Sequence, residues 1–287
     1  MKLIKYFFQF FFISFLLIFF KVIGLKLSRI ISSKLFSVLG PLFRSKKIIK
    51  KNISLAFPEA DDKFIKNIIN QMWKSYGKIL AEYMFIKYYR QIESERFLEI
   101  KGKEILKKIK SSEKPVIFIS GHFDNFELMA MHIEKSGIDL AAIYRPLNNY
   151  FLNPLMENIR KKYICKKQIK KGITGTKEIL KCFKSGTSIA LMIDQRVSEG
   201  INSNFFNQKA LTTTIPAQFV KKFNCKIVPI YIERKNGYQF KLEIFKPIEF
   251  SKNENVEIIT SDLNQVLEKM IKRNPEQWIW SHSRWKI

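Results

Sequence analysis

Short apolar runs alternate with segments of helical spacing from Phe97 onward, and this alternation constrains the fold more than any other feature. The expected strands cover residues 98–101, 116–120, 140–144, 188–193 and 227–232. Helical patterns separate them at residues 103–109, 126–135, 151–163, 176–183 and 215–223. This β-α-β order predicts an α/β fold with a mostly parallel central sheet flanked by helices. We expect residues 240–245 to add an edge strand and residues 255–272 to form a closing helix.

The stretch VIFISGHFDNFEL at residues 116–128 places a histidine at the end of one expected strand. Gly121 breaks the strand, and helical spacing starts at Phe126, with Asp124 or Asn125 as the expected cap. His122 therefore lies in a strand-to-helix turn, and Glu127 lies in the first helical turn. Open α/β sheets usually place their chemistry in loops at the carboxyl ends of strands.

This spacing suits a general base and a supporting carboxylate. A neutral imidazole can take a proton from a hydroxyl near pH 7. Glu127 could fold back onto the ring of His122, fix its tautomer and stabilise the imidazolium, while the N–H groups of the helix start could assist a developing negative charge. The alternative is a histidine at a strand end, with Glu127 complementing the helix dipole. We expect His122 and Glu127 to be the catalytic pair.

The N-terminus carries the longest apolar stretch, YFFQFFFISFLLIFF at residues 6–20. With its flanks it reaches roughly the 20 residues of a membrane-spanning helix, although a helix lying in the interface is an alternative. No A-x-A-like site follows Phe20, which disfavours a cleaved signal peptide. Basic residues after the stretch outnumber those before it, which favours a cytoplasmic location for the rest of the chain. We predict a membrane-anchor helix at residues 1–25 and one domain at residues 26–287.

Two more helical segments are expected before the first strand. Residues 25–43 have an amphipathic pattern that ends near Gly40-Pro41. A long helix is expected to start at Pro58-Glu59 with Asp61 and to run to about Tyr89.

The chain is strongly basic, with 51 Lys and Arg against 25 Asp and Glu and a net charge of +26. This charge favours polyanions: nucleic acid, phosphorylated lipid headgroups or an acidic carrier protein. The sequence shows no helix-turn-helix, zinc-finger or RNP-type pattern, and with the anchor this argues against a nucleic-acid partner. The 3 cysteines (Cys165, Cys182, Cys225) form no CxxC pair, which argues against a metal site and for reduced thiols.

Two further residues follow expected strands at the same sheet edge as His122. Arg145, in IYRPLNN, could clamp a phosphate or carboxylate, or could be a surface arginine. Asp194 ends the strand SIALMID, and an irregular loop with exposed aromatic residues is expected after it, at residues 202–206. The basic run RKKYICKKQIKK at residues 160–171 is expected to be solvated, or to dock an acidic partner.

Together these motifs resemble the lauroyl/myristoyl acyltransferases of lipid A biosynthesis, within the wider lysophospholipid (glycerolipid) acyltransferase superfamily. The matching segments cover nearly the whole chain: SGHFDNFE at 120–127, IYRPLNN at 143–149, DQ at 194–195, FFNQKALTTT at 205–214, IVPIYIER at 227–234 and PEQWIWSHSRWK at 275–286. The sequence departs from the family's common pattern at Asp124, where the family usually has Gly, and at Phe126, where it usually has Trp.

The resemblance implies transfer of a fatty acyl group from a thioester donor, usually acyl carrier protein but also coenzyme A, to a hydroxyl of a phosphorylated glycolipid. His122 would be the general base and Glu127 its orienting carboxylate. Arg145 would contact a phosphate or help the oxyanion, and Asp194 would be a structural or acceptor-binding residue. The expected substrate-binding residues are Arg145, Asp194, Asn125 and Asp124. No metal or redox cofactor is implied, and the site would face the cytoplasm at the bacterial inner membrane.

Two alternatives differ in their consequences. The same chemistry could act on another acceptor, such as a lysophospholipid or another glycolipid, including a mannosylated one. A catalytically inactive, membrane-anchored protein that binds anionic lipid or nucleic acid is the more distant alternative, and the intact His122 and Glu127 argue against it.

Overall fold

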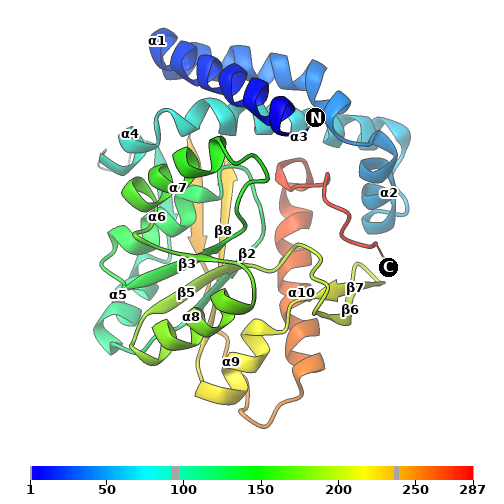
Figure 1. Cartoon of the computed structure of the whole chain (residues 1–287). Coiled ribbons are helices and arrows are strands. Elements are labelled where there is room, and N and C mark those ends of the chain that lie inside the picture. Colours follow the sequence, from blue (N-terminus) through cyan, green and yellow to red (C-terminus); the bar gives the residue numbers. More distant parts are fainter. Residues whose placement is uncertain (1, 92–96, 236–238, 287) are drawn as a thin grey trace.

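A seven-stranded sheet forms the centre of the computed structural model, which describes residues 2–91, 97–235 and 239–286 (Figure 1). The strand order is β1-β9-β8-β2-β5-β3-β4, and among these strands the β8–β9 pairing alone is antiparallel. The strands are β1 (Leu98–Lys101), β2 (Ile117–Ser120), β3 (Leu140–Tyr144), β4 (Lys167–Lys170), β5 (Ser188–Met192), β8 (Ile227–Arg234) and β9 (Phe240–Ile244). The predicted α/β fold with a mostly parallel sheet is confirmed.

Burial on both faces explains the apolar runs of the central strands. All residues of β2 and of β8 are buried, as is usual for parallel strands that helices cover on both sides. The flanking helices are α5 (Lys103–Ser112), α6 (Glu127–Lys135), α7 (Leu152–Tyr163), α8 (Ile173–Lys184), α9 (Ile215–Phe223) and α10 (Val256–Arg273). Because β2 pairs parallel with both β5 and β8, the carboxyl ends of these three strands meet at one edge of the sheet.

The structure differs from the expected strands at three places. Strand β9 is not an edge strand, because β1 pairs with it on its outer side. The basic run at residues 160–171 contains β4, an edge strand in which Ile169 alone is buried. The expected irregular loop is a hairpin of β6 (Ile201–Phe205) and β7 (Gln208–Thr212), joined at Phe206 and Asn207, which both have positive φ. Two such residues are typical of a type I′ turn, but Phe is an unusual residue there, so the turn signal was hidden.

The N-terminal third forms four helices: α1 (Lys2–Phe43), α2 (Lys46–Ala56), α3 (Asp62–Tyr83) and α4 (Ile86–Gln91). The expected long helix up to Tyr89 is therefore divided into α3 and α4. Helix α1 breaks at Gly24, whose φ of 79° and ψ of 164° are not helical, and its two halves lie across the top of the sheet domain (Figure 1).

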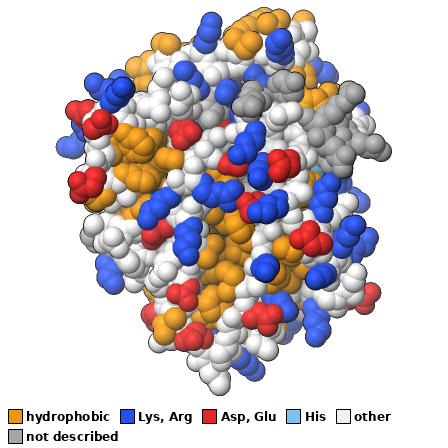
Figure 2. Space-filling view, turned by 180° about the vertical axis from the view of Figure 1, so that it is seen from behind, with side chains coloured by type: hydrophobic (Ala, Val, Ile, Leu, Met, Phe, Trp, Pro, Cys, Tyr) orange, Lys and Arg blue, Asp and Glu red, His pale blue; other side chains and the backbone are white. Residues whose placement is uncertain are grey.

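Helix α1 is long and apolar enough to cross a membrane, and it is a candidate membrane anchor. Its first half exposes large apolar side chains: Leu3, Ile4, Phe7, Phe8, Phe11, Phe12, Phe15, Ile18, Phe19 and Val22. Figure 2 shows hydrophobic side chains at the top of the molecule and in patches on the face below, with Lys and Arg side chains distributed over the whole face. The boundary between residues 1–25 and 26–287 stays a prediction.

Candidate active site

His122 lies at the carboxyl end of β2, and its carboxylate partner comes from the neighbouring strand. The ring Nδ1 of His122 lies 2.8 Å from Oδ1 of Asp194, the second residue after β5. The backbone N–H of His122 donates to Oδ2 of the same carboxylate, also at 2.8 Å. The side chain of His122 is 19% exposed and that of Asp194 is fully buried, so the ring lies between the protein interior and solvent.

The surroundings of Asp194 keep it ionised. Burial by itself raises the pKa of this carboxyl, but the positive charge that His122 carries when it is protonated and hydrogen bonds from His122 and Trp278 outweigh burial and hold the pKa below its ordinary value. Trp278 Nε1 donates to Oδ2 at 2.8 Å. A carboxylate accepts hydrogen bonds and cannot donate them, so Nδ1 of His122 carries a proton. The other ring nitrogen, Nε2, is then the basic one.

Glu127 does not occupy the position that the sequence suggested. Its Oε1 accepts hydrogen bonds from the Arg160 guanidinium, from Nε at 2.8 Å and from Nη2 at 2.6 Å, and from the hydroxyl of Tyr83. The side chains of Glu127 and Arg160 are 8% and 13% exposed, which makes this a buried ion pair. In this structure Asp194 is the carboxylate at the His122 ring and Glu127 pairs with Arg160, so the expected contact between Glu127 and the ring is not seen, and a catalytic role for Glu127 stays a prediction.

Asp124 and Asn125 are directed into the protein. Both are 2% exposed, and their polar groups bond to Arg234 and Glu82. This geometry does not favour the expected role in substrate binding, because their hydrogen-bonding groups face other side chains of the protein. It favours a role in holding the loop at residues 121–126.

Arg145 lies at the same sheet edge as His122, directly after β3, and it is exposed. Strand β5 separates β3 from β2, so Arg145 is on the far side of Asp194 from His122. No hydrogen bond or ion pair is found for its guanidinium within the described part of the chain. Arg145 is consequently available to an anionic group from solution.

The C-terminal segment completes the site, and the sequence assigned it no role. The loop pairs with it at Phe123 and Trp278, and the Asp124 N–H donates to the Gln277 carbonyl oxygen at 2.8 Å. Farther along, Nε2 of His282 accepts the Arg196 backbone N–H at 3.0 Å. Burial lowers the pKa of His282 to about 4, so this ring is neutral near pH 7.

An apolar cavity of about 810 Å³ lies next to this segment. Its walls come from both halves of α1, from α3 and from the C-terminal segment, and most of the lining surface is apolar. Gln195, the chain neighbour of Asp194, and His282 line it, and His282 is close enough to His122 and Asp194 for their charges to affect its pKa. The volume falls within the range of about 300–1,000 Å³ that is common for ligand sites.

The described cysteine, histidine and acidic side chains form no candidate metal site. Within residues 2–91, 97–235 and 239–286, no group of three or more His, Cys, Asp or Glu side chains is arranged to hold a metal ion. Cys165, Cys182 and Cys225 are free thiols.

Comparison with known proteins relates the chain to one family of enzymes. A family model described as "Bacterial lipid A biosynthesis acyltransferase" matches residues 1–287. The lipid A biosynthesis lauroyltransferase of Escherichia coli K12 is 25% identical over 251 residues, which cover 85% of this chain and 79% of that protein. The palmitoleoyltransferase of the same organism is 24% identical, with 85% and 80% of the two chains covered. Its myristoyltransferase is 20% identical, with 84% and 75% covered.

Proposed function

The chain belongs to the bacterial lipid A biosynthesis acyltransferase family, and we propose that it transfers a fatty acyl chain from an acyl carrier protein thioester to a hydroxyl of a lipid A precursor, with His122 as the general base. The family establishes an acyltransferase that acts in lipid A biosynthesis at a membrane. The donor, the acceptor hydroxyl and the catalytic residues are the proposed part. The hydrogen bond between His122 Nδ1 and Asp194 carries the catalytic assignment, because it leaves Nε2 as a base at the edge of the sheet.

The reaction follows from this tautomer. Nε2 of His122 takes the proton of the acceptor hydroxyl as its oxygen attacks the thioester carbonyl carbon. The buried carboxylate of Asp194 stabilises the imidazolium that forms. When the tetrahedral intermediate collapses, the carbon–sulfur bond breaks and the departing sulfur takes the proton back from His122. The products are an ester on the acceptor and a free thiol on the donor, so no acyl-enzyme intermediate is required.

The apolar cavity suits an acyl chain. Most of its lining residues carry apolar or aromatic side chains, and the polar ones include Gln9, Arg44, Gln195 and His282. A fatty chain buried there gains free energy from the removal of apolar surface from water, and its carbonyl end would lie near Asp194. Since α1 supplies part of the wall, the chain could enter directly from the membrane side.

The anionic parts of the substrates have basic partners on the protein. The net charge of +26 favours both an acidic carrier protein and the phosphates of the acceptor. Arg145, exposed and without a described partner, is proposed to contact an acceptor phosphate. A cytoplasmic active site at the inner membrane gives access to the carrier protein and the lipid together.

A transfer assay in detergent micelles tests the proposal. Acyl thioesters of acyl carrier protein and of coenzyme A are offered with a lipid A precursor, and in parallel with a lysophospholipid, and the products are identified by mass. We expect an acylated lipid A precursor, formed faster from the carrier-protein thioester. Acylation of the lysophospholipid alone would contradict the acceptor, and an equal or greater rate with coenzyme A would contradict the donor.

A further inference from the structure

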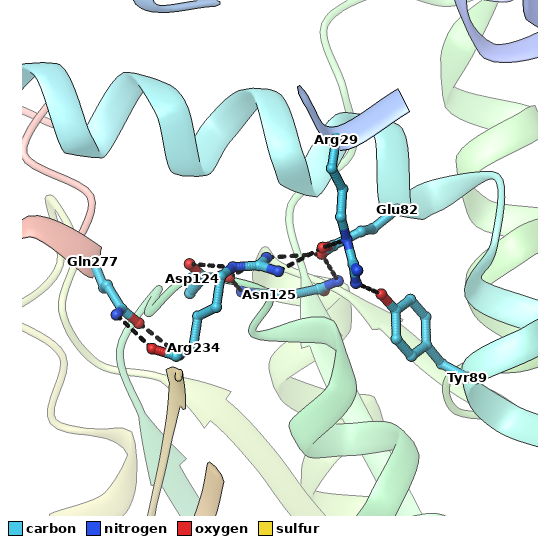
Figure 3. A network of polar contacts seen from close by, with 7 residues as sticks. All are labelled: Arg29, Glu82, Tyr89, Asp124, Asn125, Arg234 and Gln277. Atoms are coloured by element: carbon cyan, nitrogen blue, oxygen red, sulfur yellow. Dashed lines mark hydrogen bonds and ion pairs between the residues drawn. The ribbon is translucent and has the colours of Figure 1, made fainter. Parts of the chain in front are cut away.

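A buried polar network joins helix α1 to the loop that carries His122 (Figure 3). Its members come from α1, α3, α4, the loop, β8 and the short helix η2 (Pro275–Gln277). They are Arg29, Glu82, Tyr89, Asp124, Asn125, Arg234 and Gln277. None of these residues takes part in the proposed chemistry, so the network requires a separate explanation.

Glu82, at the end of α3, is the centre of the network and is fully buried. Its Oε1 accepts hydrogen bonds from Nε of Arg29 at 2.6 Å and from Nη1 of Arg234 at 2.7 Å. Its Oε2 accepts from Nη2 of Arg234 at 3.0 Å and from Nδ2 of Asn125 at 2.8 Å. One carboxylate therefore fixes the positions of α1, the end of β8 and the catalytic loop relative to each other.

Arg234 connects this carboxylate to Asp124, two residues from His122. Its Nη2 lies 2.6 Å from Oδ1 of Asp124 and its Nε lies 3.2 Å from Oδ2. Asp124 has a φ of 33°, in the left-handed region that residues with side chains rarely adopt. The same Oδ1 accepts the Asn125 N–H at 2.8 Å. The ion pair thus holds an uncommon backbone conformation within the loop.

The charges balance inside the network. Arg29 and Arg234 contribute two positive charges, Glu82 and Asp124 contribute two negative charges, and each of the four is at most 7% exposed. Burial raises the pKa of Glu82, but the two arginines and the hydrogen bonds to Arg234 and Asn125 outweigh it and keep the carboxyl ionised. Removal of one member leaves a buried charge without its partner, and a buried charge in that state drives rearrangement of its surroundings.

Arg29 links the position of α1 to the buried network through its hydrogen bond to Glu82. It lies five positions after the break at Gly24, and its Nη2 also donates to the hydroxyl of Tyr89 in α4. Helices α1 and α3 pack with little space between their backbones, because a Cβ at Gly77 would lie 2.2 Å from the Ser32 carbonyl oxygen. A displacement of α1 on α3 would therefore move Arg29 relative to Glu82.

We infer that Arg29, Glu82 and Arg234 are positioning residues for His122, and that the seating of α1 on the domain is thereby a condition for catalysis. The inference rests on the proposed function, because His122 is the base in that reaction. The network orders the loop, and the ordered loop holds the His122 ring at the distance from the acceptor hydroxyl that proton transfer requires. Misplacement of a reacting group by about 1 Å can reduce a rate by about 100-fold.

The test compares Arg29→Met with Lys26→Met, a change of the same charge at an exposed residue of the same helix. We expect Arg29→Met to lower kcat per folded molecule by about 10- to 100-fold with KM within about twofold, as misplacement of a catalytic group predicts. Lys26→Met should keep the wild-type kcat. Arg29→Lys, which retains the charge but has a single nitrogen donor, should recover part of the loss. The folded fraction is measured by circular dichroism in the same micelles.

A purely structural network gives different results. The inference is overturned if Arg29→Met lowers the melting temperature but keeps the kcat of the folded fraction, or if KM alone rises. If Arg29→Met does not fold, Arg29→Lys is compared with Lys26→Met, and a kcat per folded molecule equal to that of Lys26→Met overturns the inference.

A second measurement needs no substrate, so it separates this inference from the proposed function. Amide hydrogen exchange is followed in residues 121–127 of the wild type, Arg29→Met and Lys26→Met. We expect faster exchange of this segment in Arg29→Met alone, although Arg29 is distant from it in sequence. Unchanged exchange would refute the coupling, whereas a wild type that transfers no acyl group but shows this exchange pattern would refute only the function.

Discussion

The hydrogen-bond partner of Nδ1 in His122 determines which ring nitrogen can act as a base. Asp194 accepts from Nδ1 and also from the backbone N–H of His122, so one carboxylate fixes both the ring and its backbone. Glu127 is closer in sequence, but it is occupied by Arg160 and Tyr83. The carboxylates of Asp194 and Glu127 therefore have different roles, and one substitution at each residue distinguishes these roles.

Asp194→Asn should lower kcat severely without unfolding the protein. An amide can donate to Nδ1 and thereby favour the tautomer whose Nε2 carries the proton, and such a change costs up to about 10,000-fold in a comparable histidine–aspartate pair. Acyl-transfer kinetics and a melting curve check this prediction. A variant with more than half of the wild-type kcat would show that the tautomer does not matter.

Glu127→Gln should lower stability as well as activity. It leaves the Arg160 guanidinium buried without its counter-charge, and breaking a buried pair costs about 3–5 kcal/mol. Urea unfolding in detergent measures the loss. Full stability together with a complete loss of activity would return Glu127 to the role of a direct catalytic partner.

At the scale of elements, the sequence could predict where helices and strands lie more readily than which of them touch. The strands β2, β3, β5 and β8 have apolar runs that set them apart, β1 alternates apolar and charged residues, and their order along the chain is visible. Strand β4 was missed because an edge strand with lysines on its exposed face has no apolar run. The hairpin β6–β7 was missed because Phe206 occupies a position where Asn or Gly would be the signal.

The site could be predicted only in part for the same reason. His122 is visible because it follows a strand and a glycine, which are local signals. Its pairing with Asp194 depends on β2 and β5 being neighbours in the sheet, and no local pattern reveals that order. Glu82 and Arg234 lie at the ends of α3 and β8, and each resembles an ordinary surface charge until the fold brings them together.

A buried histidine in α6, His132, makes the free energy of unfolding of the protein dependent on pH. Burial lowers the pKa of His132 from 6.5 to about 3. Below about pH 6.5 the unfolded chain binds a proton that the folded chain does not, so stability falls with pH down to about pH 3, by about 1.4 kcal/mol per pH unit. His132→Gln should reduce this slope by that amount, while His282 maintains a slope of its own down to about pH 4.

Denaturant unfolding between about pH 7 and pH 5 measures both slopes. The same slope in wild type and His132→Gln would show that His132 is already accessible to protons in the folded protein.

At the scale of the whole molecule, α1 combines three features: an exposed apolar surface, a wall of the cavity and one end of the buried network. Membrane binding and catalysis are therefore expected to share one helix.

Ile18→Lys should reduce membrane binding, and Ile173→Lys should not. Both isoleucines are exposed, at 62% and 84%, but Ile18 lies on α1 and Ile173 lies on α8. A lysine within the apolar core of a membrane costs about 3 kcal/mol. Flotation with liposomes of anionic lipid measures the bound fraction. Equal binding of the two variants would show that α1 is not the membrane-binding element.

The most direct test of the central claim is the rate of acyl transfer by His122→Ala, measured with an acyl carrier protein thioester and a lipid A precursor. General base catalysis accounts for about 100- to 10,000-fold in rate, so a loss of that size is expected. Membrane binding should stay at the wild-type level because α1 is unchanged, and the fold should persist because Asp194 keeps its hydrogen bonds from the backbone N–H at position 122 and from Trp278. A turnover near that of the wild type would contradict the account, since another group would then have to take the hydroxyl proton.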